Sequence, residues 1–539
     1  MRLTPFLLIA ACAPSLPPEP EPPPAPLRIE AASARLPTGL ASTIVDVRAD
    51  HSLRVRPAVE PPSARAARTL QVDLLTAGTI DAHAHPIGLG RQLSELDLVD
   101  VPTYADVLAK VKNAAAGTGW LLGRGWDQND WPDTPAGGWP LAADLDALTG
   151  GRPTALRRID GHATWANSAA LAAAGITKDT ADPPGGRIIR DASGAPTGVL
   201  IDTAGDLLTV PEPDVDQVEA WLRAAQTSML EHGLVGVHDM GVDDTTLAAW
   251  RRIDAAGDLK IRVFAYLTPD SQAADDLLHE GPTWGEHLSV VGIKAYADGA
   301  LGSRGAHLSA PYADDPSTSG LAITSEEDLA ELATRCLRAR VQLAVHAIGD
   351  QAVTDTLDAF STARAAVPDA AAVPLRVEHA QVVRPEDWAR FRALNVVASM
   401  QPTHATSDMP WAEARLGADR IGWSYTWRAA SEHGVVLALG SDFPVESVDP
   451  ALGLHAATTR TDLLGQPEGG WRPDQVLDLT ASIDGFTTAT WAALGQPGPS
   501  LQTGQTADLT LWDRVGEPPE LRAVGTVIDG EVVWLAADR

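Results

Sequence analysis

Short apolar runs recur along most of the chain, and segments of helical character separate most of them. There are eight such runs, at residues 79–80, 154–159, 234–237, 290–296, 341–345, 375–377, 396–399 and 435–439. The intervening segments are rich in Ala and Leu, for example Val215 to His232 and Glu326 to Arg340. Strands that alternate with helices in this number favour an α/β fold, a TIM-like (β/α)8 barrel with a parallel sheet.

Alternating, strand-like segments flank this region on both sides. One example near the N-terminal end is TIVDVR at 43–48, and 507–513 and 524–535 alternate near the other end. The last of these contains Asp529-Gly530, a dipeptide typical of a hairpin turn. We therefore expect a small β-sandwich domain formed from both chain ends, with 27–77 as its N-terminal part, 78–496 as the barrel, and 497–539 as its C-terminal part.

Residues 1–26 have the layout of a lipoprotein-like signal peptide followed by a Pro-rich tether. Arg2 precedes the apolar run 6–11, and Cys12 follows small residues, as in the lipobox of bacterial lipoproteins. The run is too short to span a bilayer as a helix, and the proline-rich stretch 14–26 would be extended. We expect lipidation at Cys12 and an extracytoplasmic, membrane-anchored protein on the periplasmic side or the cell surface. The alternative is an untranslocated, disordered tail with a chance cysteine.

The charge balance excludes one class of partner. The chain has 41 Lys and Arg against 71 Asp and Glu, a net charge of -30. Nucleic acid is not expected as a partner, because phosphate binding requires a basic face. Anionic lipid surfaces are disfavoured as well, so membrane contact is expected only through the lipid anchor. The second cysteine, Cys336, lies in helical sequence and is expected to be a buried core residue.

Polar residues gather where the apolar runs end. His83 and His85 follow the first run, and His346, His379 and Asp442 follow three later ones. Barrel enzymes carry their chemistry at the C-terminal ends of the strands, so these side chains are expected to converge. Since His83 and His85 are two apart on extended backbone, they face the same way and could share one metal ion. A metal site is the favoured interpretation.

Seven ordered motifs carry a resemblance to a known family. They are TIDAHAHP, RRIDGHATWANSAAL, GLVGVHDMG, GIKAYADGALGSRGAHLSAPY, LAVHAIGDQAV, RVEHAQ and GSDFPVES. From about Gly78 to Leu535 the chain resembles the amidohydrolase superfamily of metal-dependent hydrolases, and within it the amidohydrolase-3 or YtcJ-like branch. The resemblance implies that 78–496 is a metal-dependent hydrolase barrel.

The resemblance also implies a ligand set. His83 and His85 would bind one metal together with Asp442, and His346 and His379 would bind a second. Lys294 falls on the fourth strand, where family members often carry a carboxylated lysine that bridges two metals; the alternative is an ordinary lysine that reaches water. One or two zinc ions are expected, because His-rich sites with an open position suit zinc, and iron or manganese stays open.

The activity implied is hydrolysis of a non-peptide carbon–nitrogen bond, in an amide or cyclic amide, by attack of metal-activated hydroxide. Asp442 would act as the general base and then as the acid that protonates the leaving nitrogen. The expected partner is a small, amide-like molecule, and a homo-oligomer stays open. Two alternatives remain: an ester or lactone hydrolase that uses the same site, and a non-catalytic binding lipoprotein on the cell surface.

Three further residues are candidates for substrate binding. His162 could hydrogen-bond the carbonyl or the leaving group. Arg304 could clamp a substrate carboxylate with two parallel hydrogen bonds, or it could tie its own glycine-rich loop to Asp298.

Other residues have less specific interpretations. For His238 we favour pairing with backbone or with Asp239, and His404 is the one remaining histidine that could line the pocket. Four tryptophans in one segment could line an apolar pocket, although a packed lid is the simpler interpretation: Trp120, Trp126, Trp131 and Trp139.

Overall fold

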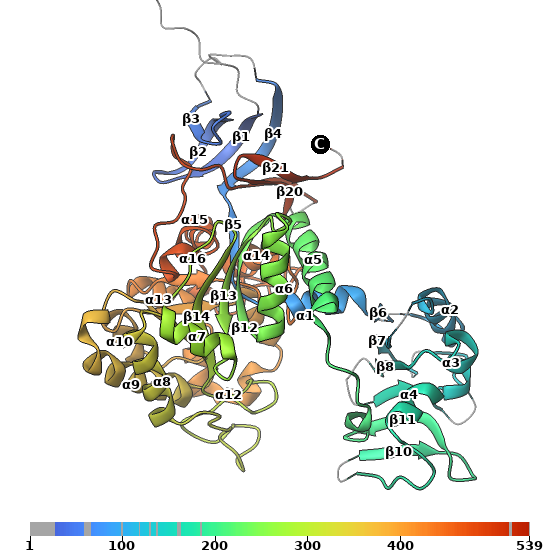
Figure 1. Cartoon of the computed structure of the whole chain (residues 1–539). Coiled ribbons are helices and arrows are strands. Elements are labelled where there is room, and N and C mark those ends of the chain that lie inside the picture. The colour runs from blue at the N-terminus through green and yellow to red at the C-terminus, as the bar shows by residue number, and fades with distance from the viewer. Residues whose placement is uncertain are drawn as a thin grey trace, which may run out of the picture.

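The computed structural model describes residues 27–58, 66–98, 101–117, 119–128, 131–135, 138–158, 163–183, 186–516, 520–537 and 539. These residues form three parts: a barrel, a β-domain at one end of the barrel, and an inserted domain beside it (Figure 1). Cys12 and the tether lie outside the described residues. Within the described part, no helix is both long enough and apolar enough to cross a membrane.

The barrel consists of eight parallel strands, each hydrogen-bonded to the next in one order. The order is β5 (Thr79–Ala84), β12 (Leu234–Val242), β13 (Arg262–Leu267), β14 (Leu288–Tyr296), β15 (Gln342–Ala347), β16 (Leu375–His379), β17 (Val396–Met400) and β18 (Leu437–Leu439). These strands are almost completely buried, as expected for a parallel sheet covered by helices. The predicted TIM-like barrel is confirmed.

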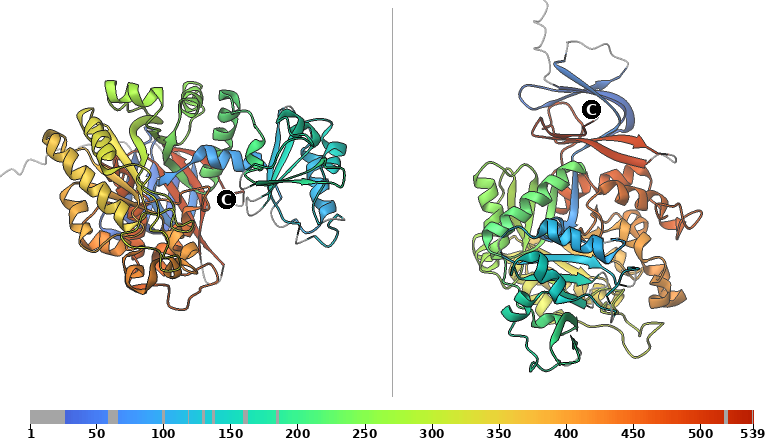
Figure 2. Two further views of the ribbon diagram at one scale, coloured as in Figure 1. Left: turned by 90° about the horizontal axis from the view of Figure 1, so that it is seen from below. Right: turned by 90° about the vertical axis from the view of Figure 1, so that its right-hand side faces the viewer.

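Helices follow most of these strands and cover the outside of the barrel (Figure 2). Side-chain N-caps begin several of them: Asp214 for α5, Asp243 for α6 and Ser325 for α8, each accepting a hydrogen bond from a backbone N–H of the first turn. The helices are α1 (Pro86–Ser94), α5 (Val215–Glu231), α6 (Asp244–Ala255), α7 (Gln272–Glu280), α8 (Glu326–Arg338), α9 (Asp350–Ala366), α10 (Asp387–Ala393), α11 (Pro402–Asp408), α12 (Ala412–Arg420), α13 (Trp427–Glu432), α14 (Pro450–Thr459), α15 (Leu479–Gly485) and α16 (Thr488–Ala493). Cys336 is buried in α8 as a free thiol, as predicted.

A buried carboxylate joins the last barrel strand to the first. Asp81 of β5 accepts hydrogen bonds from the backbone N–H and the hydroxyl of Ser441, just after β18, and from the N–H of His83. Gly440 permits this approach, since a Cβ at that position would lie 2.7 Å from the backbone nitrogen of His83. The backbone N–H of Asp442 then donates to the carbonyl of His83 at 2.8 Å. This contact places Asp442 beside the first strand.

The inserted domain corrects one strand assignment. The run at 154–159 was predicted as the second barrel strand, but β8 (Thr154–Arg158) belongs to a separate six-stranded sheet, and β13 takes its place in the barrel. A short apolar run has the same appearance in either sheet, so the pattern alone could not assign it. The sheet has the order β10 (Gly186–Arg190), β11 (Pro196–Asp202), β9 (Ala163–Ala166), β8, β7 (Leu121–Trp126) and β6 (Leu96–Asp97), with helices α2 (Tyr104–Ala114), α3 (Ala142–Thr149) and α4 (Ser168–Ala173).

Tryptophans form the core of this domain. Trp126 and Trp131 are buried with Trp165 and Tyr104, and their rings lie in edge-on or tilted contact. Packing is therefore the role of the two buried members of the predicted cluster, while Trp139 packs against the same core and Trp120 against a neighbouring one.

The β-domain is built from both chain ends, as predicted. It is one seven-stranded sheet with the order β21 (Glu531–Leu535), β20 (Glu520–Ile528), β19 (Leu509–Val515), β4 (Arg68–Ala77), β1 (Leu27–Leu36), β2 (Gly39–Val47) and β3 (Leu53–Pro57). Val45 of β2 and Val524 of β20 share one hydrophobic core although their strands are not neighbours. The predicted sandwich is thus a single sheet that curls around its own core.

Candidate metal centre

A cavity of about 410 Å³ lies at the C-terminal ends of the barrel strands. The six residues predicted as metal ligands all line it, although they come from five different strands or strand ends: His83, His85, Lys294, His346, His379 and Asp442. His404 of α11 lines it too, as the sequence allowed. The fold therefore brings the predicted set together.

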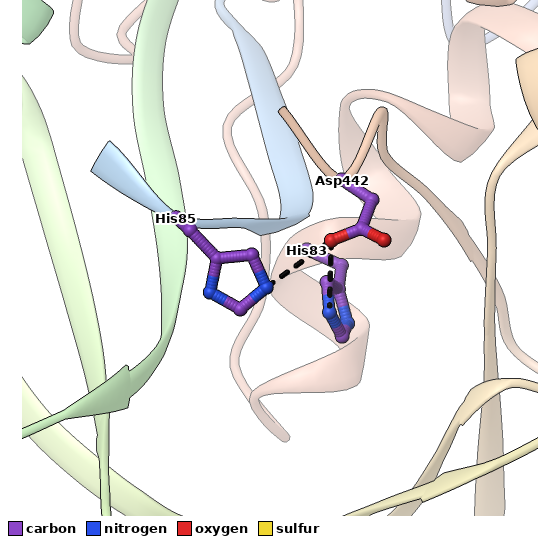
Figure 3. Close-up of side chains that lie close together, drawn as sticks. All are labelled: His83, His85 and Asp442. Atoms are coloured by element: carbon purple, nitrogen blue, oxygen red, sulfur yellow. Dashed lines mark ion pairs between the residues drawn. The ribbon is translucent and has the colours of Figure 1, made fainter. Parts of the chain in front are cut away.

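His83, His85 and Asp442 form a compact group (Figure 3). The Nε2 atoms of His85 and His83 lie 3.1 Å and 3.5 Å from the same carboxylate oxygen, Oδ1 of Asp442. Oδ1 is buried, and no hydrogen bond of acceptable geometry reaches it from the described residues. Three ligand atoms thus converge on one small volume.

The second nitrogen of each ring fixes which atom faces that volume. Nδ1 of His85 lies 2.7 Å from the carbonyl oxygen of Met240, and Nδ1 of His83 lies 2.6 Å from Oε2 of Glu378. A carbonyl or carboxylate oxygen accepts only, so both Nδ1 atoms carry a proton, and in the neutral ring each Nε2 presents a lone pair. Lone pairs that face a carboxylate oxygen repel it unless a cation lies between them. The residues therefore fit a divalent metal ion.

Asp442 also belongs to a second group. His379 donates from Nδ1 to Oε1 of Gln401 at 2.8 Å, so its Nε2 is free to bind a metal as well. Nε2 of His404 lies 3.7 Å from Oδ2 of Asp442 and is buried without a hydrogen-bond partner among the described residues. The second group therefore consists of His379, His404 and Asp442.

The ring of His346 is next to that of His379, with centroids 4.5 Å apart, but its Nε2 faces the loop after β14. In this structure His404 stands in the second group where the resemblance implied His346. A metal-binding role for His346 remains a prediction.

A buried ion pair between Arg376 and Glu378 holds the ring of His83 in place. Arg376 of β16 donates from Nε to Oε1 of Glu378 at 2.7 Å and from its terminal nitrogens to the Tyr266 hydroxyl and to Nδ1 of His238. Burial alone would raise the pKa of Glu378, but Arg376 and His83 together hold that pKa well below its usual range. Glu378 is therefore an anion that fixes the tautomer and the orientation of His83.

Burial determines the charge of the other groups. It lowers the pKa of His83 to about 4 and that of His346 to about 3, so both rings are neutral at neutral pH. Lys294 is only 1% exposed, and burial lowers its pKa to about 8. Burial would raise the pKa of Asp442, and protons on the surrounding rings, that of His85 foremost, would lower it to about 2. The centre thus offers neutral imidazoles, one ionised carboxylate and the Lys294 amine, which is mostly protonated at neutral pH.

Backbone strain coincides with the same residues. Asp442 has φ 65° and His379 has φ 69°, in the left-handed region that residues other than glycine rarely adopt. Such conformations persist where the surrounding structure enforces them, and they cluster at functional sites.

Of the three predicted substrate-binding residues, the two that the structure describes do not line the cavity. Asp298 is buried and accepts hydrogen bonds from the backbone N–H groups of His307, Ile348 and Gly349, so it holds the loop after β15. Arg304 pairs with Asp314 at 2.9 Å and does not line the cavity. His162 lies outside the described residues.

His238 differs from the expectation as well. It contacts Arg376 rather than Asp239, whose carboxylate accepts from Nε1 of Trp250. The positions of strand ends do not single out Arg376 or Glu378, although two charged residues at alternate positions of a buried strand are a usable signal.

The Glu378 contact makes a testable prediction. Replacing Glu378→Gln removes the anion that orients His83, so we expect metal affinity to fall about 10- to 100-fold, measured by competition with a chromogenic chelator. Asp46→Asn, which disrupts a buried ion pair of the β-domain, is the matched control and should lower stability but not metal affinity. Equal metal affinity in wild type and Glu378→Gln would contradict this account of His83.

Comparison with known proteins agrees with the geometry. The profile of the amidohydrolase family (Amidohydro_3) matches residues 73–534. The amidohydrolase-like protein YtcJ of Bacillus subtilis is 33% identical over 475 residues, which cover 85% of this chain and 88% of YtcJ. N-substituted formamide deformylase of Arthrobacter pascens is 28% identical over 422 residues, 72% of this chain and 75% of that enzyme.

The solved structures include a metal-dependent hydrolase from Pyrococcus furiosus with a TM-score of 0.73 and 26% identity, covering 91% of this chain and 99% of that one. The family profile begins within β4 of the β-domain and covers the inserted domain, all eight barrel strands and the C-terminal strands of the β-domain, and the converging histidines lie within it. The chain belongs to the amidohydrolase family of metal-dependent hydrolases.

Proposed function

We propose that the protein hydrolyses a non-peptide carbon–nitrogen bond in a small amide or cyclic amide. The observation that carries the proposal is the convergence of two imidazole lone pairs on the buried Oδ1 of Asp442. The similarity to an N-substituted formamide deformylase supports the choice of bond, since that enzyme's name describes the removal of a formyl group from nitrogen.

His83, His85 and Asp442 would hold one metal ion, and His379 with His404 or His346 would contribute to a second position. A bound divalent metal ion would lower the pKa of its water molecule to near neutral pH, and the ion would also polarise the carbonyl of the substrate. Asp442 is ionised at neutral pH and lines the cavity, so it can accept the proton of the attacking water. The same carboxyl group can then donate that proton to the leaving nitrogen, which departs as an amine.

We propose zinc as the metal, with iron or manganese as the alternatives, because neutral histidines and a carboxylate are ligands that zinc prefers. We also propose that Lys294 is carboxylated. Its Nζ lies 3.3 Å from Nε2 of His83, and its lowered pKa increases the fraction of neutral amine that can react with carbon dioxide. The carbamate would present two anionic oxygens between the two groups of ligands.

The bond type is tested with paired substrates, an amide and an ester that share one acyl group. We expect the zinc-loaded protein to hydrolyse the amide, and Asp442→Asn to lower kcat/KM by about a hundredfold to ten-thousandfold because the proton carrier is lost. Rates are measured by release of the amine or alcohol. Turnover of esters alone would replace the proposal with an ester or lactone hydrolase, and turnover of neither would favour a binding protein.

Metal content tests the paired centre. Protein purified without chelator should contain about two equivalents of metal by elemental analysis, and Lys294→Ala should contain one or fewer because the bridge is lost. Lys294→Arg keeps the positive charge but cannot form the carbamate. A carbamate carbon signal should therefore be seen by NMR in ¹³C-bicarbonate with the wild type and not with Lys294→Arg. Wild-type protein without bound metal would contradict the hydrolase proposal.

We further propose that Cys12 carries a lipid that anchors the protein on the outer side of a membrane. The support is the order of apolar run, cysteine and proline-rich tether in the sequence. Cys12→Ser should move the protein from the membrane fraction to the soluble fraction, because the anchor is lost. Unchanged membrane association of Cys12→Ser would rule out this anchor.

A further inference from the structure

We propose that the outer part of the catalytic cavity binds a positively charged amine on the substrate. This inference rests on the proposed hydrolytic function and specifies its substrate class. It is carried by two carboxylates and two aromatic rings that line the cavity on the outer side of the candidate metal ligands: Asp408, Glu446, Tyr296 and Trp411.

Asp408 lies on α11, the helix that also carries His404 of the second candidate ligand group. His404, whose Nε2 lies 3.7 Å from Oδ2 of Asp442, is one helical turn before Asp408 on α11, so the two side chains share a face of the helix. The Tyr425 hydroxyl donates to Oδ2 of Asp408 at 2.6 Å, and Nε2 of Gln381 donates to the same oxygen at 2.8 Å. Asp408 is therefore held in one orientation beside the cavity.

Glu446 places a second carboxylate at the same end. It lies four residues after Asp442, is half-buried, and lines the cavity beside Val445, which is 69% exposed. Burial raises the pKa of Glu446 and of Asp408, which means that each carboxylate is incompletely solvated. A bound cation would relieve that cost.

The aromatic rings suit the same ligand. Tyr296 is 40% exposed, and Nζ of Lys294 lies 5.1 Å from its ring centroid, so this ring already contacts an amino group. Trp411 lines the cavity next to α11. Aromatic faces combined with carboxylates are a common arrangement for binding organic ammonium groups.

Positive charge is lacking at this end of the cavity. Among the described residues that line it there is no arginine, and Lys294 is the one lysine, buried among the candidate metal ligands. The nearby arginines Arg304 and Arg415 both pair with Asp314. The Arg415 guanidinium also lies 5.7 Å from the centroid of the Trp411 ring, so Tyr296 offers the more accessible aromatic face. A substrate carboxylate at this outer end would therefore meet the carboxylates of Asp408 and Glu446.

Arginines instead gather in a different cleft of about 680 Å³, between α1 and the inserted domain, lined by Arg91, Arg124, Arg157 and Arg158. Binding of an anionic substrate in this cleft is the alternative that the experiment must distinguish from the proposal. If the substrate were an anion held there, selectivity would depend on these arginines rather than on Asp408 and Glu446.

The test uses three acetamides that differ only at the far end of the chain: N-acetyl-1,5-diaminopentane, N-acetylpentylamine and N-acetyl-5-aminopentanoate. Binding to the zinc-loaded full-length protein is measured by calorimetry, and kcat/KM by amine release. We expect the cation to bind roughly tenfold more tightly than the anion, with the neutral compound between them. Asp408→Asn and Glu446→Gln should each reduce that cation-to-anion ratio several-fold.

Glu446→Gln is the safer of the two variants for folding, because Glu446 lies in a loop and is half-buried. Glu95→Gln, in the arginine-lined cleft, is the matched control and should leave the ratio unchanged. Equal binding of the three compounds would overturn the proposal. So would preference for the anion, and loss of that preference in Arg124→Gln would assign recognition to the arginine-lined cleft. Preferential binding of the cation without hydrolysis of any compound would support the inference while contradicting the proposed function.

Discussion

Arg376 lies in the middle of the barrel, fully buried, and its guanidinium contacts groups from five strands: Ala82, His238, Tyr266, Glu378 and Ser399. A buried cation of this kind is stable only when its charge is compensated and its donors are used. The carboxylate of Glu378 compensates the charge of Arg376, and its Oε2 accepts a hydrogen bond from Nδ1 of His83 at 2.6 Å, which fixes the orientation of that ring. The orientation of the first candidate ligand therefore depends on an ion pair one layer below the cavity.

The closure of the barrel provides the second constraint. Asp81 holds Ser441, and the next residue, Asp442, takes a strained backbone conformation with its carboxylate between His83 and His85. The imidazoles and the one anion give this group an excess of electron pairs, which the Lys294 amine, 3.3 Å from Nε2 of His83, offsets only in part. Metal binding would remove that imbalance, and the hydrogen bond from the backbone N–H of Asp442 to the carbonyl of His83 holds this residue beside the first strand.

Much of this arrangement could be predicted from the sequence. Parallel strands expose their C-terminal ends at one face, so His83, His85, His379 and Asp442 were expected to meet once eight strand-helix units were identified. The pairing of strands distant in sequence was harder to predict. The run at 154–159 and β13 have similar local patterns, and only their hydrogen-bonded neighbours show that the first belongs to the inserted domain and the second to the barrel. The position of His404 depends on how α11 packs, and Arg304 found its partner ten residues away in its own loop, so neither could be predicted from strand-end spacing.

Diffraction from crystals of the zinc-loaded protein, measured on both sides of the zinc absorption edge, tests the metal centre most directly. The account predicts anomalous density within bonding distance of Nε2 of His83 and of His85 and of an Asp442 oxygen. The partly exposed cluster of Glu286, His287 and Asp529 between barrel and β-domain serves as an internal comparison, since it could hold a metal by proximity alone. Anomalous density at that cluster, with none beside His83 and His85, would contradict the account.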